Sequence, residues 1–348
     1  MNRSASYVVP LRWTRPGPIE ELAAYLRRVA EEVEEVIVVD GSPAPLFERH
    51  AELLGAGVRH LPPDPGLRFR MGKVNGVITA LRSCTRERVV IADDDVRYGP
   101  AALRRTIELL EEADLVRPQN YFDALPWHAR WDTARSLLNR VFTGDLEFPV
   151  GDFPGTLAVR RSSFLAAGAY DGDALFENLE LMRTICAGGG RVVTPLDLYV
   201  ARRPPDTRHF LSQRVRQAYD DFAIPVRLGA WLTIWPLLVV PGRRRRRAAI
   251  AAAASVAIAE AGRRRAGGTA VFPASGSLLA PAWLVERASC AWLAVGARLR
   301  GGTRYGEGRV RHAATSPRTL RRRYEESPTR SATGPGDGSL SARNPIVL

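Results

Sequence analysis

Apolar residues in the first half of the chain form short continuous runs that alternate with stretches of helical spacing. The runs at 5–11, 35–42 and 88–96 are rich in Val or Ile and end at turns or carboxylates. Parallel strands buried on both faces have such runs, whereas apolar residues three or four apart, as at 18–33, indicate a helix. The pattern predicts βαβ units. Further strands are expected at 58–61 and 114–118, and further helices at 45–55, 74–81 and 100–112.

The stretch from 119 to 222 is less regular. Its spacing predicts helices at 127–142, 176–189 and 208–222. A strand is expected at 191–195, and 151–164 is expected to contain a loop, a short strand and the start of a helix.

The composition changes after about residue 225. Two apolar stretches, 229–242 and 248–259, are separated by the arginines at 243–247, and the residues after about 325 are rich in Ser, Pro, Gly and Thr. This organisation predicts an α/β domain at 1–225, an apolar, Arg-rich helical region at 226–300 that is expected to associate with a membrane, and a basic, largely disordered tail at 301–348.

The net charge of +13 comes entirely from the second part of the chain. Residues 1–222 contain 29 basic and 31 acidic side chains, whereas residues 223–348 contain 21 and 6. Such a split indicates a near-neutral domain joined to a segment that meets an anionic surface. The basic residues alternate with Ala-rich runs and not with aromatic stacking positions, which argues against a nucleic-acid partner.

Cysteine usage indicates a reduced compartment. Cys84, Cys186 and Cys290 lie far apart and form no disulfide framework. The first residues lack the apolar core of an export signal. We therefore expect a cytoplasmic catalytic part.

Three consecutive carboxylates, Asp93, Asp94 and Asp95, follow the apolar run at 88–92. Ligands of open α/β sheets bind at the carboxyl ends of the strands, and carboxylate oxygens there suit Mg²⁺ or Mn²⁺. A metal at this place could neutralise a leaving diphosphate. The alternative is that these residues only begin the next helix, where carboxylates are favourable.

Two other segments have the residue types of a phosphate or nucleotide site. Asp40 ends the run VIVVD and could bind a base or ribose, although Asp-Gly-Ser is also an ordinary turn. Arg68, Arg70 and Lys73, the only lysine, lead into a helix, whose amino terminus attracts phosphate. The alternative for this segment is a solvated basic loop.

These segments together resemble the inverting glycosyltransferases of family 2, which have the GT-A fold, from about residue 5 to 222. VVDGS at 38–42, GKVNGVITAL at 72–81 and IADDDV at 91–96 are similar to the family's nucleotide-binding strand end, GK segment and DXD region. The later motifs, also in matching order, are AVRRSSFLAAGAYD at 158–171, FENLELMRTICAGGGRVV at 176–193 and QRVRQ at 213–217.

The resemblance implies a GT-A, Rossmann-like mixed sheet flanked by helices, and a nucleotide-sugar donor that is most often a UDP-sugar. It implies a divalent metal, Mg²⁺ or Mn²⁺, held by Asp95 and Asp93. The donor-binding residues implied are Asp40, Lys73, Asp93, Asp94, Arg214 and Arg216.

Two positions depart from the family pattern. The second residue of the family's Glu-Asp pair usually supplies the catalytic base, but the chain has Glu177-Asn178, and an amide cannot take a proton at neutral pH. Glu177 and Asp152 are therefore the candidate bases. Gln217 stands where Trp is usual, which favours a single transfer over polymer synthesis.

The tail predicts attachment at the cytoplasmic face of the plasma membrane. The 14 residues at 229–242 would form a helix of about 21 Å, short of the ~30 Å bilayer core. Peripheral, monotopic or short-hairpin attachment is expected, through clustered Arg and the anchors Trp231, Trp235, Trp283 and Trp292. Membrane proximity suggests a lipid-linked or cell-envelope acceptor. The alternative is an Ala-rich helical subdomain that packs on the catalytic core.

Two other functions remain open at this point. A sugar-phosphate nucleotidyltransferase would also use carboxylates and Mg²⁺, but PLRWTRPGP at 10–18 is a poor match to the Gly-rich loop of that class. A non-catalytic nucleotide-sugar or membrane-surface binding protein would account for Asn178.

Overall fold

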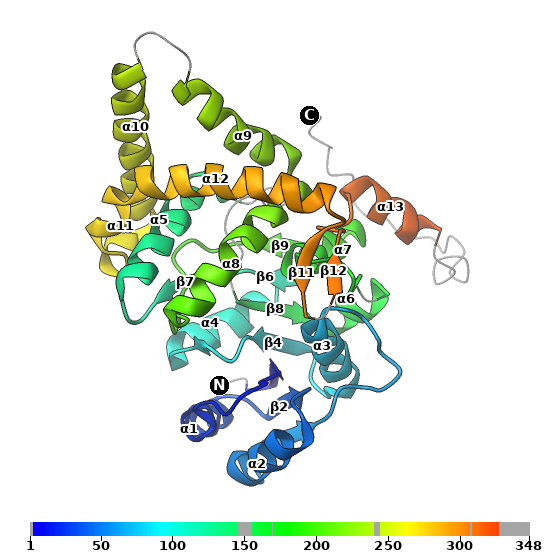
Figure 1. Cartoon of the computed structure of the whole chain (residues 1–348). Coiled ribbons are helices and arrows are strands. Elements are labelled where there is room, and N and C mark those ends of the chain that lie inside the picture. The colour runs from blue at the N-terminus through cyan, green and yellow to red at the C-terminus, as the bar shows by residue number, and fades with distance from the viewer. Residues whose placement is uncertain (1–2, 145–154, 169, 240–243, 307, 327–348) are drawn as a thin grey trace, which may run out of the picture.

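A mixed β-sheet runs through the part of the chain that the computed structural model describes, residues 3–144, 155–168, 170–239, 244–306 and 308–326 (Figure 1). Within these residues the sheet has seven strands in the order β3-β2-β1-β4-β8-β6-β9. In that order, the strands are β3 (Arg59–Leu61), β2 (Glu35–Asp40), β1 (Ala5–Leu11), β4 (Arg88–Ala92), β8 (Thr156–Arg160), β6 (Leu115–Val116) and β9 (Val192–Val193).

The first half of this sheet is parallel, as the sequence predicts. β1 lies between β2 and β4, with Val8 opposite Ile37 on one side and Ile91 on the other. Tyr7 and Val9 face one hydrophobic cluster and Val8 faces the other, so both faces are covered. Burial on both faces explains why these strands consist of continuous apolar runs.

The second half contains an antiparallel strand, which makes the sheet mixed. β8 runs antiparallel to β4 and to β6, and β6 is parallel to β9. The expected mixed α/β class is therefore confirmed.

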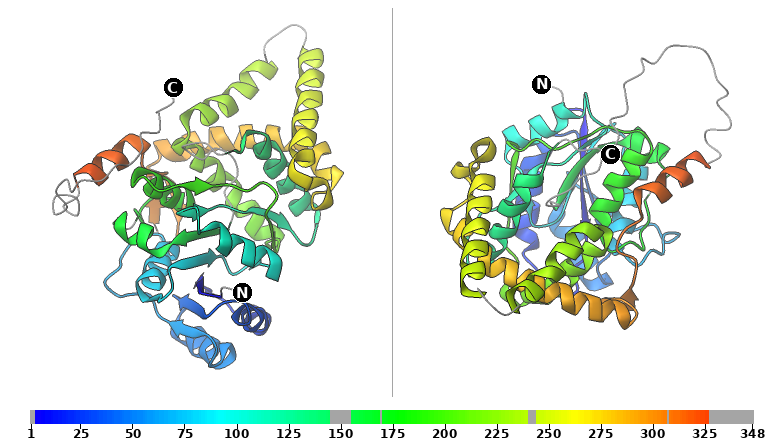
Figure 2. Two further views of the ribbon diagram at one scale, coloured as in Figure 1. Left: turned by 180° about the vertical axis from the view of Figure 1, so that it is seen from behind. Right: turned by 90° about the horizontal axis from the view of Figure 1, so that it is seen from above.

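Helices cover both faces of the sheet (Figure 2). α1 and α4 contribute to one hydrophobic cluster, whereas α3, α6 and α7 contribute to the other. The helices up to residue 219 are α1 (Ile19–Ala30), α2 (Ala44–Leu54), α3 (Gly72–Ser83), α4 (Pro100–Leu109), α5 (Trp127–Phe142), α6 (Arg161–Ala166), α7 (Glu177–Ala187) and α8 (Thr207–Tyr219).

A second, three-stranded sheet stands beside the carboxyl end of β4. It consists of β5 (Val96–Arg97), β10 (Tyr199–Arg202) and β7 (Gln119–Phe122), with β10 in the middle. β10 is antiparallel to β5 and parallel to β7. This small sheet brings residue 202 next to residues 93–95.

The helices after residue 219 pack on the α/β part of the chain. These elements are the 3-10 helix η1 (Asp220–Ala223), α9 (Pro225–Val239), α10 (Arg244–Arg264), the 3-10 helix η2 (Arg265–Ala270), α11 (Ala274–Leu278) and α12 (Ala280–Leu299). Figure 1 shows α12 lying across α8 and α5. Cys290 and Ala294 of α12 join the same hydrophobic cluster as β1 and α3.

Small residues allow these helices to come close to α5. A Cβ atom at Gly262 of α10 would lie 2.0 Å from the carbonyl oxygen of Leu137 in α5, so only glycine fits there. Ala259 of α10 and Trp283 of α12 are both buried in a third cluster with residues of α5. The Ala-rich composition therefore serves helix packing, which is the alternative stated above for this stretch. No helix in the described part of the chain is both long enough and apolar enough to cross a bilayer.

Residues 303–306 and 308–325, within the part expected to be a largely disordered tail, are folded. They form the hairpin of β11 (Thr303–Tyr305) and β12 (Gly308–Val310) and then α13 (Pro317–Glu325). Val310 and Ala313 are buried in the same hydrophobic cluster as β1 and α3. Three backbone groups of 312–315 bond to the start of α7: His312 and Ala313 accept from Leu175 and Phe176, and the Thr315 amide donates to buried Glu180. The expected boundary at residue 301 thus falls inside the folded body.

Candidate active site

The carboxylates after β4 are joined to three other charged residues in what we call the ionic chain. Lys73 Nζ lies 2.7 Å from Asp93 Oδ1 and 3.0 Å from Glu177 Oε1. Arg202 lies 2.7 Å from Asp95 Oδ2 and 4.0 Å from Asp93 Oδ2. The order is therefore Asp95, Arg202, Asp93, Lys73, Glu177, and the sequence predicted all of its members except Arg202.

The secondary structure fixes each member of this chain. Lys73 is in the first turn of α3, Glu177 begins α7, and Arg202 ends β10. The backbone amide of Asp93 donates to Gly155 O at 2.8 Å, which holds the turn after β4 against the start of β8. The side chains converge because the elements end at the same edge of the sheet.

Burial and ion pairing act in opposite directions on the two central carboxylates. Burial raises the pKa of Asp93, and nearby Asp95 adds to this, so that Lys73 and Arg202 only partly offset the increase. Burial also favours a higher pKa for Glu177, but Lys73 and Arg216 outweigh it and lower this pKa below its ordinary value. Glu177 is therefore ionised at neutral pH and able to accept a proton.

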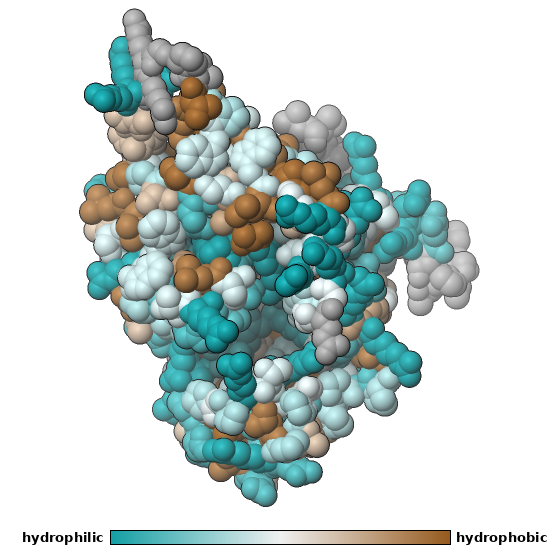
Figure 3. Space-filling model, viewed as in Figure 1, coloured by the Kyte–Doolittle hydropathy of each residue, from teal (hydrophilic) through white to brown (hydrophobic). Residues whose placement is uncertain are grey.

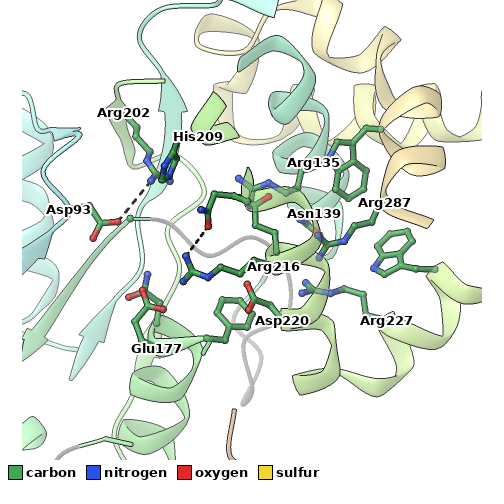
Figure 4. A pocket seen from close by; sticks show the side chains of 17 residues that line it. Asp93, Arg135, Asn139, Glu177, Arg202, His209, Arg216, Asp220, Arg227 and Arg287 are labelled. Carbon is green, nitrogen blue, oxygen red and sulfur yellow. Dashed lines mark hydrogen bonds and ion pairs between the residues drawn. The ribbon is translucent and has the colours of Figure 1, made fainter. Parts of the chain in front are cut away.

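Two cavities meet at Asp93, which lines both. The first, here called the strand-end cavity, has a volume of about 380 Å³ and lies beyond the carboxyl ends of β1, β2 and β4. The second, the arginine cavity, has a volume of about 240 Å³ (Figure 4). The strand-end cavity is lined by Arg12, Gly41, Lys73, Asn75, Asp94 and Tyr305 among others, and the arginine cavity by Glu177, Arg202, Arg216, Asp220, Arg227 and Arg287 among others.

Asp94 and Asp95 have different surroundings. Asp94 Oδ2 accepts a hydrogen bond of 2.5 Å from Trp13 Nε1, and this residue lines the strand-end cavity. Asp95 Oδ2 is bonded to Arg202, whereas its Oδ1 is buried and has no partner among the described residues. A buried carboxylate oxygen without a donor is a fit position for a cation.

Asp40 lies at the end of β2 but lines neither of the two cavities. Its side chain is 1% exposed and accepts from His50 Nδ1 at 2.6 Å and from His60 Nε2 at 3.1 Å. Burial opposes ionisation, but the hydrogen bonds from His60, Ser42 and His50 lower the pKa of Asp40 to about 2. In this structure Asp40 joins β2, β3 and α2, so a direct contact with a donor is not supported by its position.

Stability should depend on pH through Asp40. Its folded-state pKa lies below the unfolded value, so its contribution is present above about pH 4 and is lost as the pH falls toward 2. The size expected is about 2 kcal/mol. Urea unfolding measures the free energy of unfolding of the wild type and of Asp40→Asn. The difference between the two values should shrink as the pH falls from about 4 toward 2. A difference that stays constant, or an equal change in the exposed control Asp197→Asn, would contradict this assignment.

The two arginines of QRVRQ lie on different sides of α8. Arg214 is 6% exposed and pairs with Asp132 at 2.9 Å and Glu286 at 2.7 Å, so it ties α8 to α5 and α12. It lines neither cavity, and the predicted donor role for it has no support from its position. Arg216 lines the arginine cavity, donates to Gln213 and stacks over the ring of Tyr305 at 5.0 Å.

The remaining predicted residues lie outside the site or outside the described part of the chain. Asp152, the second candidate base, lies outside the described residues. Within those residues, no group of three or more His, Cys, Asp or Glu side chains is placed to hold a metal without further ligands. Trp283 is 2% exposed and cannot be an interfacial anchor in this arrangement, whereas Trp292 is 48% exposed.

Sequence reasoning missed Arg12, Arg202, Asp220, Arg287 and Tyr305. Asp220 had a usable signal, since Asp220-Asp221 directly follows QRVRQ at the end of an amphipathic helix. Burial raises the pKa of Asp220 to about 7. Arg202 and Arg287 come from segments without a motif, and only the fold brings them to the site. Tyr305 lies in GGTRYGEGRVR at 301–311, a segment that resembles the tail end of membrane-linked family members but gives no sign of a site residue.

Comparisons with known proteins give structural likenesses only. No family model matches the sequence, and no curated protein matches it either. A mannosyltransferase from Pyrobaculum calidifontis, solved with GDP-Man and Mn²⁺, is 20% identical with a TM-score of 0.48, covering 83% of this chain and 87% of that one. Glucosyl-3-phosphoglycerate synthase from Mycobacterium tuberculosis was solved with Mn²⁺, uridine diphosphate and phosphoglyceric acid. It is 20% identical with a TM-score of 0.42, and the match covers 60% of this chain and 73% of that one. At these TM-scores the likeness does not by itself assign a function to this chain.

Proposed function

We propose that the chain is a metal-assisted glycosyltransferase of the GT-A type that moves a sugar from a nucleotide donor to an acceptor hydroxyl with inversion. The observation that carries this proposal is the position of Asp93. It lies between two cavities and is linked through one lysine to Glu177 on the far side. A group transfer needs such an arrangement, because donor and acceptor must meet at one point.

The strand-end cavity is the donor side in this proposal. It lies where nucleotides bind in open α/β sheets, and Arg12 and Lys73 bring positive charge to it. Arg12 lies against the start of α3, since a Cβ atom at Gly72 would be 3.4 Å from one of its guanidinium nitrogens, an ordinary van der Waals contact. A uridine nucleotide is the donor we expect from the family resemblance.

Asp93 and Asp95 are the residues that would hold Mg²⁺ or Mn²⁺. The unpartnered Oδ1 of Asp95 supports this, and the diphosphate and water would complete the ligand set. A bound metal would supply charge neutralisation for the departing nucleoside diphosphate. Arg202 already neutralises part of the charge on both carboxylates, which keeps them close together.

The arginine cavity is the acceptor side, and Glu177 lies at its border with the donor side. The acceptor oxygen forms a bond to the anomeric carbon while the bond from that carbon to the diphosphate oxygen breaks and leaves its electron pair with the nucleotide. The hydroxyl proton passes to the Glu177 carboxylate. Attack from the face opposite the leaving group inverts the anomeric centre.

A nucleotide titration tests the donor assignment. We expect one nucleoside diphosphate to bind more tightly with Mn²⁺ than without it, and Asp95→Asn to weaken that metal-dependent binding by about tenfold or more. Calorimetry with the uridine, guanosine and adenosine diphosphates measures this, with exposed Asp197→Asn as the matched control. Absence of binding for every nucleotide would rule out the transferase. Binding without turnover would favour the non-catalytic protein, for which Asn178, 3.5 Å from Lys73, is the supporting observation.

We also propose attachment to the cytoplasmic face of the plasma membrane through α9 and the start of α10. α9 is apolar, yet Leu228 is its only residue that is buried, among those described. Leu237 and Val239 are 60% and 58% exposed, and the exposed arginines 245–247 follow closely in the chain. Figure 3 shows apolar side chains gathered over the part of the molecule where Figure 1 places α9 and α12. An apolar surface beside clustered arginine suits an anionic bilayer.

Vesicle flotation tests this attachment. We expect binding to phosphatidylglycerol vesicles that weakens with salt, and little binding to phosphatidylcholine vesicles. Replacing Leu237 and Val239 by Ser should reduce the bound fraction, whereas Leu165→Ser on α6 should not. A wild-type chain that stays unbound with both vesicles at low salt would rule the attachment out.

A further inference from the structure

The hairpin of β11 and β12 contributes one residue to the wall of the strand-end cavity. Tyr305, the last residue of β11, lines this cavity together with Lys73, Asp93 and Asp94. Among the described residues that line it, Tyr305 is the only aromatic one. A cavity built at the ends of β1, β2 and β4 is therefore completed by a side chain from a much later part of the chain.

Hydrogen bonds hold this hairpin on two sides. Arg70, shortly before α3, donates from Nη1 to Arg309 O at 2.9 Å. The hydroxyl of Tyr219, the last residue of α8, donates to Arg311 O at 2.9 Å. The hairpin thus connects the segment that enters α3 with the end of α8, and these contacts fix the place of Tyr305 between the two.

The ring of Tyr305 lies against the guanidinium group of Arg216. The Cζ atom of Arg216 is 5.0 Å from the centre of the ring. Figure 4 shows this guanidinium group turned toward Asp93 and Glu177. Its other partner is the amide oxygen of Gln213 at 2.9 Å, and it forms no ion pair with a carboxylate in the part of the chain that the structure describes. A ring and an amide hold this cation, and neither of them neutralises its charge.

The contact between these two side chains crosses from one cavity to the other. Arg216 lines the arginine cavity and Tyr305 lines the strand-end cavity, while Asp93 lines both. We call the place where Asp93 lines both cavities the junction. An arginine side chain has many rotamers, and stacking on an aromatic face restricts them. Without the ring, Arg216 would be free to turn away from the junction.

We propose that Tyr305 is a positioning residue whose ring holds the Arg216 guanidinium group at the junction, where Arg216 binds the terminal phosphate of the donor's nucleoside diphosphate. The inference rests on the proposed function for the identity of this ligand. The terminal phosphate is the one joined to the sugar, so it lies between the donor side and the acceptor side. A guanidinium fork matches phosphate oxygens, and its charge offsets the negative charge that develops as the bond to the sugar breaks.

Calorimetry with Mn²⁺ can compare a nucleoside diphosphate with the monophosphate of the same base, for uracil, guanine and adenine. We expect Tyr305→Leu to weaken diphosphate binding by about five- to tenfold and to change monophosphate binding by less than about twofold. Tyr305→Phe keeps the ring and should bind both ligands as the wild type does. Arg304→Gln, an exposed neighbour in the same hairpin, is the control and should also match the wild type.

A double-mutant cycle shows whether Tyr305 acts through Arg216. Arg216→Gln alone should weaken diphosphate binding by about tenfold. Adding Tyr305→Leu to Arg216→Gln should weaken it by less than about twofold more, because the ring then has no guanidinium group to hold. Circular dichroism verifies that each variant is folded, and Tyr305→Met, which also lacks the ring, replaces Tyr305→Leu if the latter does not fold.

The outcomes separate this inference from the proposed function. Losses that multiply in the double variant, or equal losses for the monophosphate and the diphosphate, would overturn the positioning role of Tyr305. Unchanged diphosphate binding in Tyr305→Leu would overturn it as well, while the donor site itself stands. A wild-type chain that binds no nucleoside diphosphate would overturn the proposed function and this inference together.

Discussion

Glu177→Gln should lower the rate of sugar transfer by about 10²–10⁴-fold while nucleotide binding stays within a few-fold of the wild type. The substitution keeps the shape and the hydrogen bond from Lys73 but removes the group that takes the acceptor proton. Glu177 is 14% exposed, lines the arginine cavity and is linked through Lys73 to Asp93, where the two cavities meet. Initial rates of nucleoside diphosphate release, with binding measured by calorimetry, give both quantities.

The pH dependence provides a further check on Glu177. Because its pKa lies below the ordinary value, the wild-type rate should change little with pH on the acidic side until well below neutrality. An unchanged rate in Glu177→Gln would contradict this role and move attention to Asp220, whose pKa of about 7 suits a base. In that case the rate of sugar transfer should fall in Asp220→Asn instead. Glu108→Gln, on the surface of α4, is the control for a general effect of amide substitution.

Arg140→Met should destabilise the protein by about 3 to 5 kcal/mol. Arg140 is 1% exposed and joins α5 to the later helices by donating to Gly262 O at 3.1 Å and Arg265 O at 2.8 Å. It also bonds the hydroxyl of Tyr199 at 2.8 Å. Methionine fills the space but leaves these carbonyl oxygens buried without a donor.

Arg130→Met is the control for Arg140, because Arg130 is on the same helix, is exposed and donates to a single carbonyl, Leu125 O. Its effect should stay within about 0.5 kcal/mol. Urea unfolding followed by circular dichroism measures both variants. Equal free energies of unfolding for Arg140→Met and Arg130→Met would show that Arg140 does not hold the helices after residue 219 to the α/β part.

The strands were predictable where burial on both faces leaves a continuous apolar run. β1 and α5 have the predicted bounds, 5–11 and 127–142, because their patterns end at turn residues. The direction of β8 was not predictable, since an antiparallel strand buried on both faces has the same composition as a parallel one. The small sheet of β5, β10 and β7 was missed because its strands are short and half-polar.

The site was predictable where its residues follow strands or begin helices. Asp93, Asp95, Lys73 and Glu177 occupy such positions, and they lie together. Asp40 was placed correctly at a strand end, but the sequence could not show that His50 and His60 would surround it. Arg214 and Arg216 are two residues apart, and only the packing of α5 and α12 determines which of them faces the cavity.

The sequence left open whether the helices after residue 225 meet a membrane or the α/β part, because hydropathy does not say what an apolar face contacts. Ala288, Ala291 and Ala294 of α12 are fully buried, and Ala294 belongs to the hydrophobic cluster of β1 and α3. Alanine and glycine affect the mean hydropathy of a segment in the same way whether it lies in a bilayer or packs closely against another helix. The exposed residues of α9 are the part of this stretch that still fits the membrane expectation.

The bonds between residues 312–315 and the start of α7 have a consequence for synthesis. Glu177 is held by a helix whose first turn is bonded to a segment more than 130 positions later in the chain. Because a protein is made from its amino terminus, the earlier strands and helices can fold on the ribosome while this support is still missing. The candidate active site would then be completed only after residue 315 has been made, so a nascent chain, or one terminated before this residue, would have the sheet and its covering helices but would lack this support for Glu177.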